Sequence, residues 1–406
     1  RIVSTPERSQ ILQNLRLWGQ AWFHHGDRSA SYNLPGRPLL DLPLGVLFVI
    51  GLMSLPWGPK RQVRALWVVG LALVSILPSL FSDHAPHFLR ACGVVVPTAV
   101  AIGAGASTIE RLARRVVRTA APIVPAVLLA AAGWTTYRDF HSQWLPRSEV
   151  SILMEQPVVE AITSVRERLS TDMPVYLSPY SPAHPVLLFS AASLPSQRLA
   201  GFDSHQCLVV ADVPSVHINL TMYNPGFRQN LAQWASVSLL PWEKPRSQFP
   251  GRYHIYLVKP QEHIPAIGNP VVFAESLQLR ALGPIPTSLA AGSTLTVHLS
   301  MRALRPLDRP YSVFVHLYGA RTPDEGGSLY AQGDSLICPS YPTPAWKPDE
   351  TIVQPFALPI SADTPVGSYI IAVGVYGFPT GARLPVTAPG GLHEDYFEIG
   401  RIAVAE

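Results

Sequence analysis

Residues 65–81 read ALWVVGLALVSILPSLF, an apolar run without a charged side chain. Three further runs share this character, at residues 39–56, 88–107 and 120–136. Each is close to the length of about 20 residues that a helix needs to cross the hydrocarbon core of a bilayer. Within the four runs only Asp41 and Arg90 are charged, and both lie near an end. The sequence therefore predicts four transmembrane helices within residues 39–137.

The composition of the chain agrees with a membrane-embedded segment. The 406 residues are 48% hydrophobic and only 14% charged, whereas soluble proteins average about 25% charged residues. The net charge of +4 is modest, and the basic residues gather in short loops rather than on one amphipathic face. Nucleic acid is therefore a poor candidate partner. The length predicts more than one domain.

The loops between the apolar runs predict the orientation. Two of them are basic, and they contain Lys60, Arg61 and Arg64 in the first and Arg111, Arg114, Arg115 and Arg118 in the second. The loop at residues 82–87 has no Lys or Arg. Because cytoplasmic loops carry an excess of positive charge, we expect a multi-pass protein of the plasma membrane. Residues 1–38, the 82–87 loop and everything after about residue 137 would lie outside the cytoplasm.

The segment before the first run predicts an amphipathic helix over residues 6–23. Its apolar stripe includes Leu12, Leu15 and Trp18. Such a helix could lie along the outer membrane surface or pack on the bundle, and the sequence leaves both alternatives open. Residues 1–38 are therefore interpreted as an extracytoplasmic juxtamembrane segment.

The remainder of the chain divides into two predicted parts. Residues 138–262 have the pattern of a small α/β unit, with a helix at 158–169 and strands at 175–177, 207–211 and 253–258. No glycine-rich loop follows these strands, so no nucleotide cofactor is predicted. Residues 263–406 predict an antiparallel β-sandwich, because short strands alternate with Pro and Gly turns. The predicted strands are 277–282, 294–301, 312–318, 351–358, 368–376 and 396–404.

The three cysteines are too few for a disulfide framework. Cys92 lies in an apolar run and is interpreted as a small hydrophobic residue. A bridge between Cys207 and Cys338 requires an oxidising compartment, and the spacing leaves it open. No Cys or His pattern predicts a metal site.

Two groups of motifs point to a family. The segments NLPGRPLL (33–40) and LPSLFSDHAPHFLR (77–90), ending at Pro97, resemble the C-terminal membrane part of bacterial glycosyltransferase family 39, a group similar to protein O-mannosyltransferases and aminoarabinose transferases. The segments VFVHL (313–317), QGD (332–334), YPTPAW (341–346) and GSY (367–369) resemble the β-sandwich appended to such proteins in filamentous phototrophic and related bacteria.

The resemblance implies a function outside the cytoplasm. The intact protein would transfer a sugar from a polyprenyl-phosphate carrier to a glycan, lipid or protein acceptor, without a cofactor. The catalytic carboxylate of the family lies in an outer loop near the N-terminus of a longer chain, and this sequence has no counterpart of it. No catalytic residue is therefore assigned, and we expect the sequence to be an inactive portion of a longer protein. The alternative is a non-catalytic, membrane-anchored surface protein that binds glycans or a partner.

Two groups of binding residues are predicted. Arg90, His87, His84 and Arg37 lie near the outer ends of the membrane runs, where a lipid phosphate would sit, and a guanidinium offers paired donors to a phosphate. The competing interpretation is that Arg90 reaches toward headgroups or pairs with Asp83. Trp346, Tyr341 and Asp334 could form a sugar platform, although a Trp in this position commonly closes a core edge.

Overall fold

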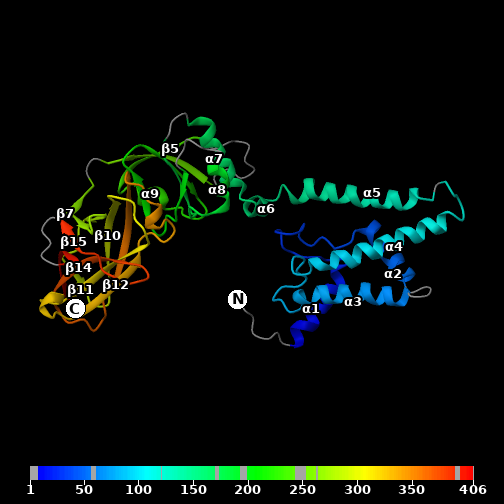
Figure 1. Cartoon of the computed structure of the whole chain (residues 1–406), viewed down its shortest axis with the longest axis horizontal. Helices are drawn as coiled ribbons and strands as arrows, with labels where there is room; N and C mark the ends of the chain where they lie inside the picture. The colour runs from blue at the N-terminus through cyan, green and yellow to red at the C-terminus, as the bar shows by residue number, and fades with distance from the viewer. Residues whose placement is uncertain are drawn as a thin grey trace. The chain divides into compact units, whose positions relative to one another are not determined.

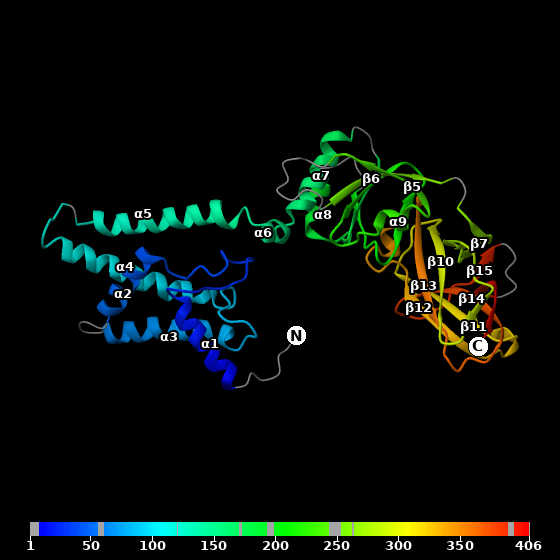
Figure 2. The same cartoon turned by 180° about the vertical axis from the view of Figure 1, so that it is seen from behind.

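A computed structural model describes residues 8–55, 61–119, 121–169, 173–192, 199–242, 253–261, 264–388 and 394–405. The chain forms two compact units, Arg1–Met154 and Glu155–Glu406. Among the described residues the first unit is helical, and the second contains all of the strands (Figures 1 and 2).

The helical unit contains six α-helices and two shorter helical turns within the described residues. They are α1 (Arg8–Ala21), α2 (Leu42–Ser54), α3 (Arg61–Leu80), η1 (Cys92–Val94), α4 (Val95–Ala113), α5 (Ile123–Arg138), η2 (Asp139–Trp144) and α6 (Ser148–Leu153). The helix α1 packs against the end of α3. The side chain of Asn14 donates to the carbonyl oxygens of Leu80 and Ser82, and Trp18 is buried. Of the two alternatives for this segment, the structure shows packing on the bundle.

Two of the predicted membrane runs become helical stretches long and apolar enough to cross a bilayer, Gln62–Leu80 and Cys92–Ala113. The first run yields only the shorter apolar helix α2, because Asp41 caps its N-terminus by accepting from the backbone N–H of Leu44. The fourth run forms the helix α5, which has 16 residues, fewer than the about 20 that a helix needs to cross the hydrocarbon core. The helix of the third run starts at Cys92 rather than at Phe88.

The backbones of α2 and α4 approach each other closely at Gly51 and Gly105. A Cβ atom on Gly51 would lie 1.8 Å from the carbonyl oxygen of Ala101, and one on Gly105 would lie 1.9 Å from that of Leu47. Ala101 and Gly105 are four residues apart, so they form a small-xxx-small pair on one face of α4. This is the pattern by which helices approach closely in membranes.

The described residues of the second unit form three sheets. The first has the strand order β2-β1-β4-β6-β5, the second β15-β7-β8-β10-β13-β3, and the third β12-β11-β14-β16-β9. The strands are β1 (Val175–Ser178), β2 (Leu199–Gly201), β3 (Leu208–Ala211), β4 (Ser215–Leu220), β5 (Ala235–Leu240), β6 (Tyr253–Pro260), β7 (Ala266–Phe273), β8 (Leu277–Leu282), β9 (Ser288–Ala290), β10 (Thr294–Ala303), β11 (Tyr311–Tyr318), β12 (Leu329–Leu336), β13 (Glu350–Pro359), β14 (Gly367–Gly377), β15 (Val386–Ala388) and β16 (Tyr396–Ala405).

The first sheet is mixed and forms the α/β part. Strands β2, β1 and β4 are parallel, and β4, β6 and β5 are antiparallel. One face packs against α7 (Gln156–Arg168) through Val175, Leu177 and Ile218. The helices α8 (Pro185–Ala192) and α9 (Phe227–Leu231) complete this part. The opposite face presents Tyr176 and Tyr256 to the large core shared with the other sheets. Because successive side chains of a strand point to opposite faces of the sheet, this sheet contributes side chains to two separate cores.

The second and third sheets form a β-sandwich in which nearly all strand pairs are antiparallel. Residues on alternate positions, such as Leu279, Leu299, Val315 and Val373, meet in one buried core. The predicted strand 207–211 belongs here rather than to the α/β sheet, because β3 pairs antiparallel with β13. The short sequence of a buried strand does not tell which sheet it joins. The predicted parts 138–262 and 263–406 therefore share one sheet and one core.

Candidate functional site

The segment after α1 and the loop at residues 82–91 are held together by a buried carboxylate. Asp27 is 6% exposed, and its two oxygens accept from the backbone N–H groups of Ser29 (2.8 Å) and Phe88 (2.9 Å). These bonds join the segment after α1 to the loop at residues 82–91. A buried carboxylate is stable only when it is hydrogen-bonded. The bonds from Ser29 and Phe88 to Asp27 therefore hold the segment and the loop in this arrangement.

A second anchor fixes the base of the 82–91 loop. The hydroxyl of Ser79 accepts from the indole N–H of Trp18 (3.0 Å) and from the backbone N–H of His87 (2.8 Å). The loop therefore begins at the end of α3, and Ser79 links it to Trp18 of α1. We call this loop, residues 82–91, the platform.

Three of the predicted phosphate-binding residues lie on this platform. The backbone N–H of Arg90 donates to Nδ1 of His87 at 3.4 Å, and the His87 ring packs against Tyr32 with the centroids 5.6 Å apart. The side chains of Arg90 and His84 are exposed. Within the described ranges no carboxylate pairs with Arg90, so the alternative pairing with Asp83 is not formed. The platform thus presents one guanidinium and two imidazoles on a single loop.

Arg37 is engaged elsewhere. Its guanidinium lies 3.4 Å from Asp139 and 3.9 Å from Asp41, and it donates to the hydroxyl of Thr136 at 2.9 Å. These partners belong to the end of α5 and the start of α2, so Arg37 ties the segment before α2 to α5. The structure gives Arg37 a role in tertiary packing, because carboxylates already occupy the side on which a phosphate would bind.

The predicted sugar platform is not assembled. Tyr341 and Trp346 are buried at 1% and 6% exposure, and the indole N–H of Trp346 donates to the carbonyl oxygen of Tyr341. Asp334 lies on β12 and contacts Nε2 of His316 at 3.2 Å. The two aromatic faces are therefore covered by core side chains, whereas Asp334 belongs to a separate group on the outer side of β11.

Glu350 is a buried carboxylate that sequence reasoning missed. It is 1% exposed, and it accepts from the hydroxyls of Tyr176 (2.9 Å) and Tyr341 (2.7 Å) and from the backbone N–H of Lys347 (3.0 Å). Burial and the neighbouring carboxylate raise the pKa of Tyr176, so its hydroxyl remains a donor. This cluster joins the α/β sheet to the sandwich, and its role is structural.

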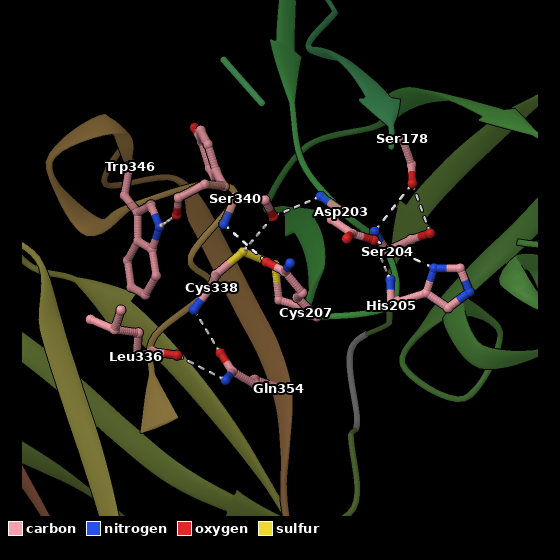
Figure 3. The surroundings of a disulfide bond; sticks show 12 residues. Ser178, Asp203, Ser204, His205, Cys207, Leu336, Cys338, Ser340, Trp346 and Gln354 are labelled. Atoms are coloured by element: carbon pink, nitrogen blue, oxygen red, sulfur yellow. Dashed lines mark hydrogen bonds and ion pairs between the residues drawn. A yellow bond between two sulfur atoms is a disulfide. The ribbon is translucent and has the colours of Figure 1, made fainter. Parts of the chain in front are cut away.

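The disulfide between Cys207 and Cys338 lies at the same junction (Figure 3). It joins residues 131 positions apart, with the Cα atoms 5.5 Å from each other. Hydrogen bonds flank it: the Ser340 hydroxyl accepts from the N–H of Asp203, and the side chain of Gln206 accepts from the N–H of Ser340. The N–H of Cys338 donates to Gln354 at 2.7 Å. The sequence left this pairing open, and the structure contains it.

His217, on β4, is fully buried, and neither ring nitrogen has a hydrogen-bond partner among the described residues. The rings of Tyr176, Phe202 and Phe227 surround it. Burial lowers its pKa to about 3, so the imidazole is neutral in the folded protein. Within the described ranges no three His, Cys, Asp or Glu side chains come together as a metal site requires.

Comparison with known proteins does not assign a family. No family model matches the chain, and no curated protein matches it. A β-glucosidase from Listeria innocua bound to isofagomine is 15% identical over 32% of this chain and 16% of that chain, with a TM-score of 0.20. A bacterial adhesin from Mobiluncus mulieris is 14% identical over 32% of this chain and 57% of its own, with a TM-score of 0.21. The aligned part thus spans less than two thirds of either protein, and likenesses of this size support no conclusion about function.

Proposed function

We propose that this chain is the C-terminal membrane portion of a glycosyltransferase that uses a polyprenyl-phosphate-linked sugar outside the cytoplasm. The observation that carries the proposal is the 82–91 platform, which presents Arg90, His84 and His87 at one end of an apolar helical unit. These residues belong to the segment that resembles family 39 glycosyltransferases. A phosphate at the membrane interface would bind to such a cluster through charge-assisted hydrogen bonds.

The surface of the helical unit supports a multi-pass arrangement. Large apolar side chains are exposed along three helices, including Leu66 and Trp67 on α3, Val96 on α4 and Val127 on α5. Apolar side chains exposed in this way are favourable next to lipid tails and unfavourable in water. Arg64 lies in the first turn of α3 and Arg114 directly follows α4, whereas the platform follows the end of α3 and precedes α4. Lys60, of the first basic loop, lies outside the described residues.

The disulfide supports an extracytoplasmic location for the second unit. Disulfides persist in oxidising compartments and are rare in the cytosol. Cys207 and Cys338 are bridged, whereas Cys92 in the helical unit is free. An outer location of the second unit agrees with the cytoplasmic placement of the two basic loops by the positive-inside rule.

Cysteine labelling in intact cells tests this topology. In a background with Cys92→Ser, the variants Asp83→Cys and Arg115→Cys place one exposed thiol at each end of the helical unit. A membrane-impermeant maleimide should label Asp83→Cys in intact cells and should label Arg115→Cys only after lysis. Labelling of Arg115→Cys in intact cells would rule out the proposed orientation.

Ligand binding tests the phosphate platform. Purified chain should retain polyprenyl phosphate and should bind the matching polyprenol, which lacks the phosphate, much more weakly. The variant Arg90→Ala should abolish this difference, whereas Arg111→Ala, at the opposite end, should leave it unchanged. Equal retention of polyprenyl phosphate by Arg90→Ala and the wild type would contradict the proposed role of Arg90.

A further inference from the structure

A hollow of about 220 Å³ lies beside the disulfide in the second unit. Its lining comes from three parts of the chain: the segment around His205 and Gln206, the end of α9 with the turn that follows it, and β10 and β13 of the sandwich. Asn230 lies in α9, and Gln233 and Trp234 lie in the turn. We call it the amide cup, after Gln206, Asn230 and Gln233. It is distinct from the predicted sugar platform, none of whose residues lines it.

The described residues that line the amide cup include no carboxylate, Lys or Arg. Its polar lining consists of amides, a hydroxyl and the imidazoles of His205 and His298. Burial lowers the pKa of His298, which keeps that ring neutral. A charged ligand would lose hydration here without a carboxylate, Lys or Arg among the described lining residues to offset the loss, which is unfavourable.

The cup also has a defined apolar side. Trp234 packs on the ring of His298 with the centroids 5.4 Å apart, and Leu208, Val353 and Pro355 continue this surface. Its polar side is provided by side-chain amides, each of which offers both donors and an acceptor. Asn230 and Gln233 are exposed, so their amides can meet a ligand without rearrangement of the core. Pockets for drug-sized ligands occupy about 300–1,000 Å³, so the cup suits a smaller molecule.

These features together point to one class of ligand. We propose that the amide cup binds a single neutral sugar ring, one ring face on the apolar side and its hydroxyls on Asn230 and Gln233. A neutral sugar matches the cup because its hydroxyls both donate and accept while its C–H groups are apolar. The disulfide at Cys207 holds one wall of the cup to the sandwich. The inference does not rest on the transferase proposal, since the cup lies entirely within the second unit.

Saturation-transfer NMR on the full chain tests the proposal. The probes are the methyl glycosides of glucose, mannose, galactose and N-acetylglucosamine, with glucuronate as the charged comparison. A zwitterionic detergent is required, because maltoside detergents themselves carry sugar rings. At least one neutral glycoside should bind, and glucuronate should bind more weakly. Absence of binding by all four glycosides, or preferential binding of glucuronate, would overturn the proposal.

The chain offers a matched control for the residues. The double variant Asn230→Ala/Gln233→Ala should weaken binding at least about tenfold, whereas Gln229→Ala should not. Gln229 is an exposed amide on the same helix and does not line the cup. All three substitutions are on the surface, so circular dichroism should show an unchanged fold. Equal binding by the double variant and Gln229→Ala would refute the assignment. Sugar binding that persists in Arg90→Ala would separate this site from the phosphate platform.

Discussion

Substitution of Gly105 tests whether the close crossing of α2 and α4 stabilises the helical unit. In Gly105→Val, the new Cβ atom would lie 1.9 Å from the carbonyl oxygen of Leu47, whereas ordinary contact begins at 3.4 Å. The two backbones would have to separate by about 1.5 Å, because a carbonyl oxygen within a helix cannot move alone. Overpacking of a well-packed interface costs about 1–3 kcal/mol, and the rigid neighbour places this substitution near the upper end.

The magnitude can be measured as a shift in thermal stability. For a unit of this size, 1 kcal/mol corresponds to about 2–4 °C, so we expect the unfolding midpoint of Gly105→Val to fall by about 6–12 °C. The assay is the loss of the monodisperse peak in size-exclusion chromatography after heating the detergent-solubilised chain. Gly51→Val should behave similarly, because its Cβ atom would lie 1.8 Å from the Ala101 oxygen.

Gly103→Val is the matched control. Gly103 lies on the same helix, two residues from Gly105, and nothing lies within 4 Å of its added Cβ atom. Both variants replace glycine with valine in the same helix and so carry the same change in helix propensity. The difference between their stabilities therefore measures the effect of the close packing between α2 and α4. If Gly103→Val and Gly105→Val lose equal stability, propensity alone explains the effect and the argument from close packing fails.

Three further substitutions have expected outcomes. The folded pKa of His217, about 3, lies below the unfolded value of 6.5. The wild type should therefore lose up to about 1.4 kcal/mol of stability for each unit that the pH decreases from 6.5 to about 3. His217→Phe should remove this dependence of stability on pH. An unchanged pH profile would show that His217 is not the group responsible. Glu350→Gln should lower the unfolding free energy in urea by about 2–3 kcal/mol, since hydrogen bonds to a charged acceptor are lost, whereas the exposed Glu275→Gln should change it little. Asp27→Ala should leave the N–H groups of Ser29 and Phe88 unpaired and speed limited proteolysis of the 82–91 loop several-fold. A cleavage rate equal to that of the wild type would mean that Asp27 does not hold this loop.

Local patterns predicted nine strands of the second unit, but they did not predict β2, β4, β5, β7, β9, β12 and β15. The predicted strand 277–282 coincides with β8, and the strand 396–404 differs from β16 by one residue at its end. The reason is that alternation and turn residues act over a few positions and report directly on local structure. Asp41 likewise proved to be a helix-end charge, because capping is a local interaction.

Pairing between distant segments is what the sequence did not determine. The run 207–211 read correctly as a strand, yet only the fold places β3 beside β13. Cys207 and Cys338 are 131 residues apart, and spacing alone carries no information about whether such residues meet. Trp346 and Tyr341 read equally well as a binding platform or as core, and burial decided for the core.

The sequence by itself determined the apolar runs, nine of the strands and the division into a helical and a β-rich part, because these depend on composition and on periods of two to four residues. Only the tertiary structure decided that Arg37 is held by carboxylates, that Glu350 links two sheets and that uncharged amides line a hollow beside the disulfide. Such properties depend on which distant side chains share a position in space and on how much water reaches them, and neither is encoded at short range.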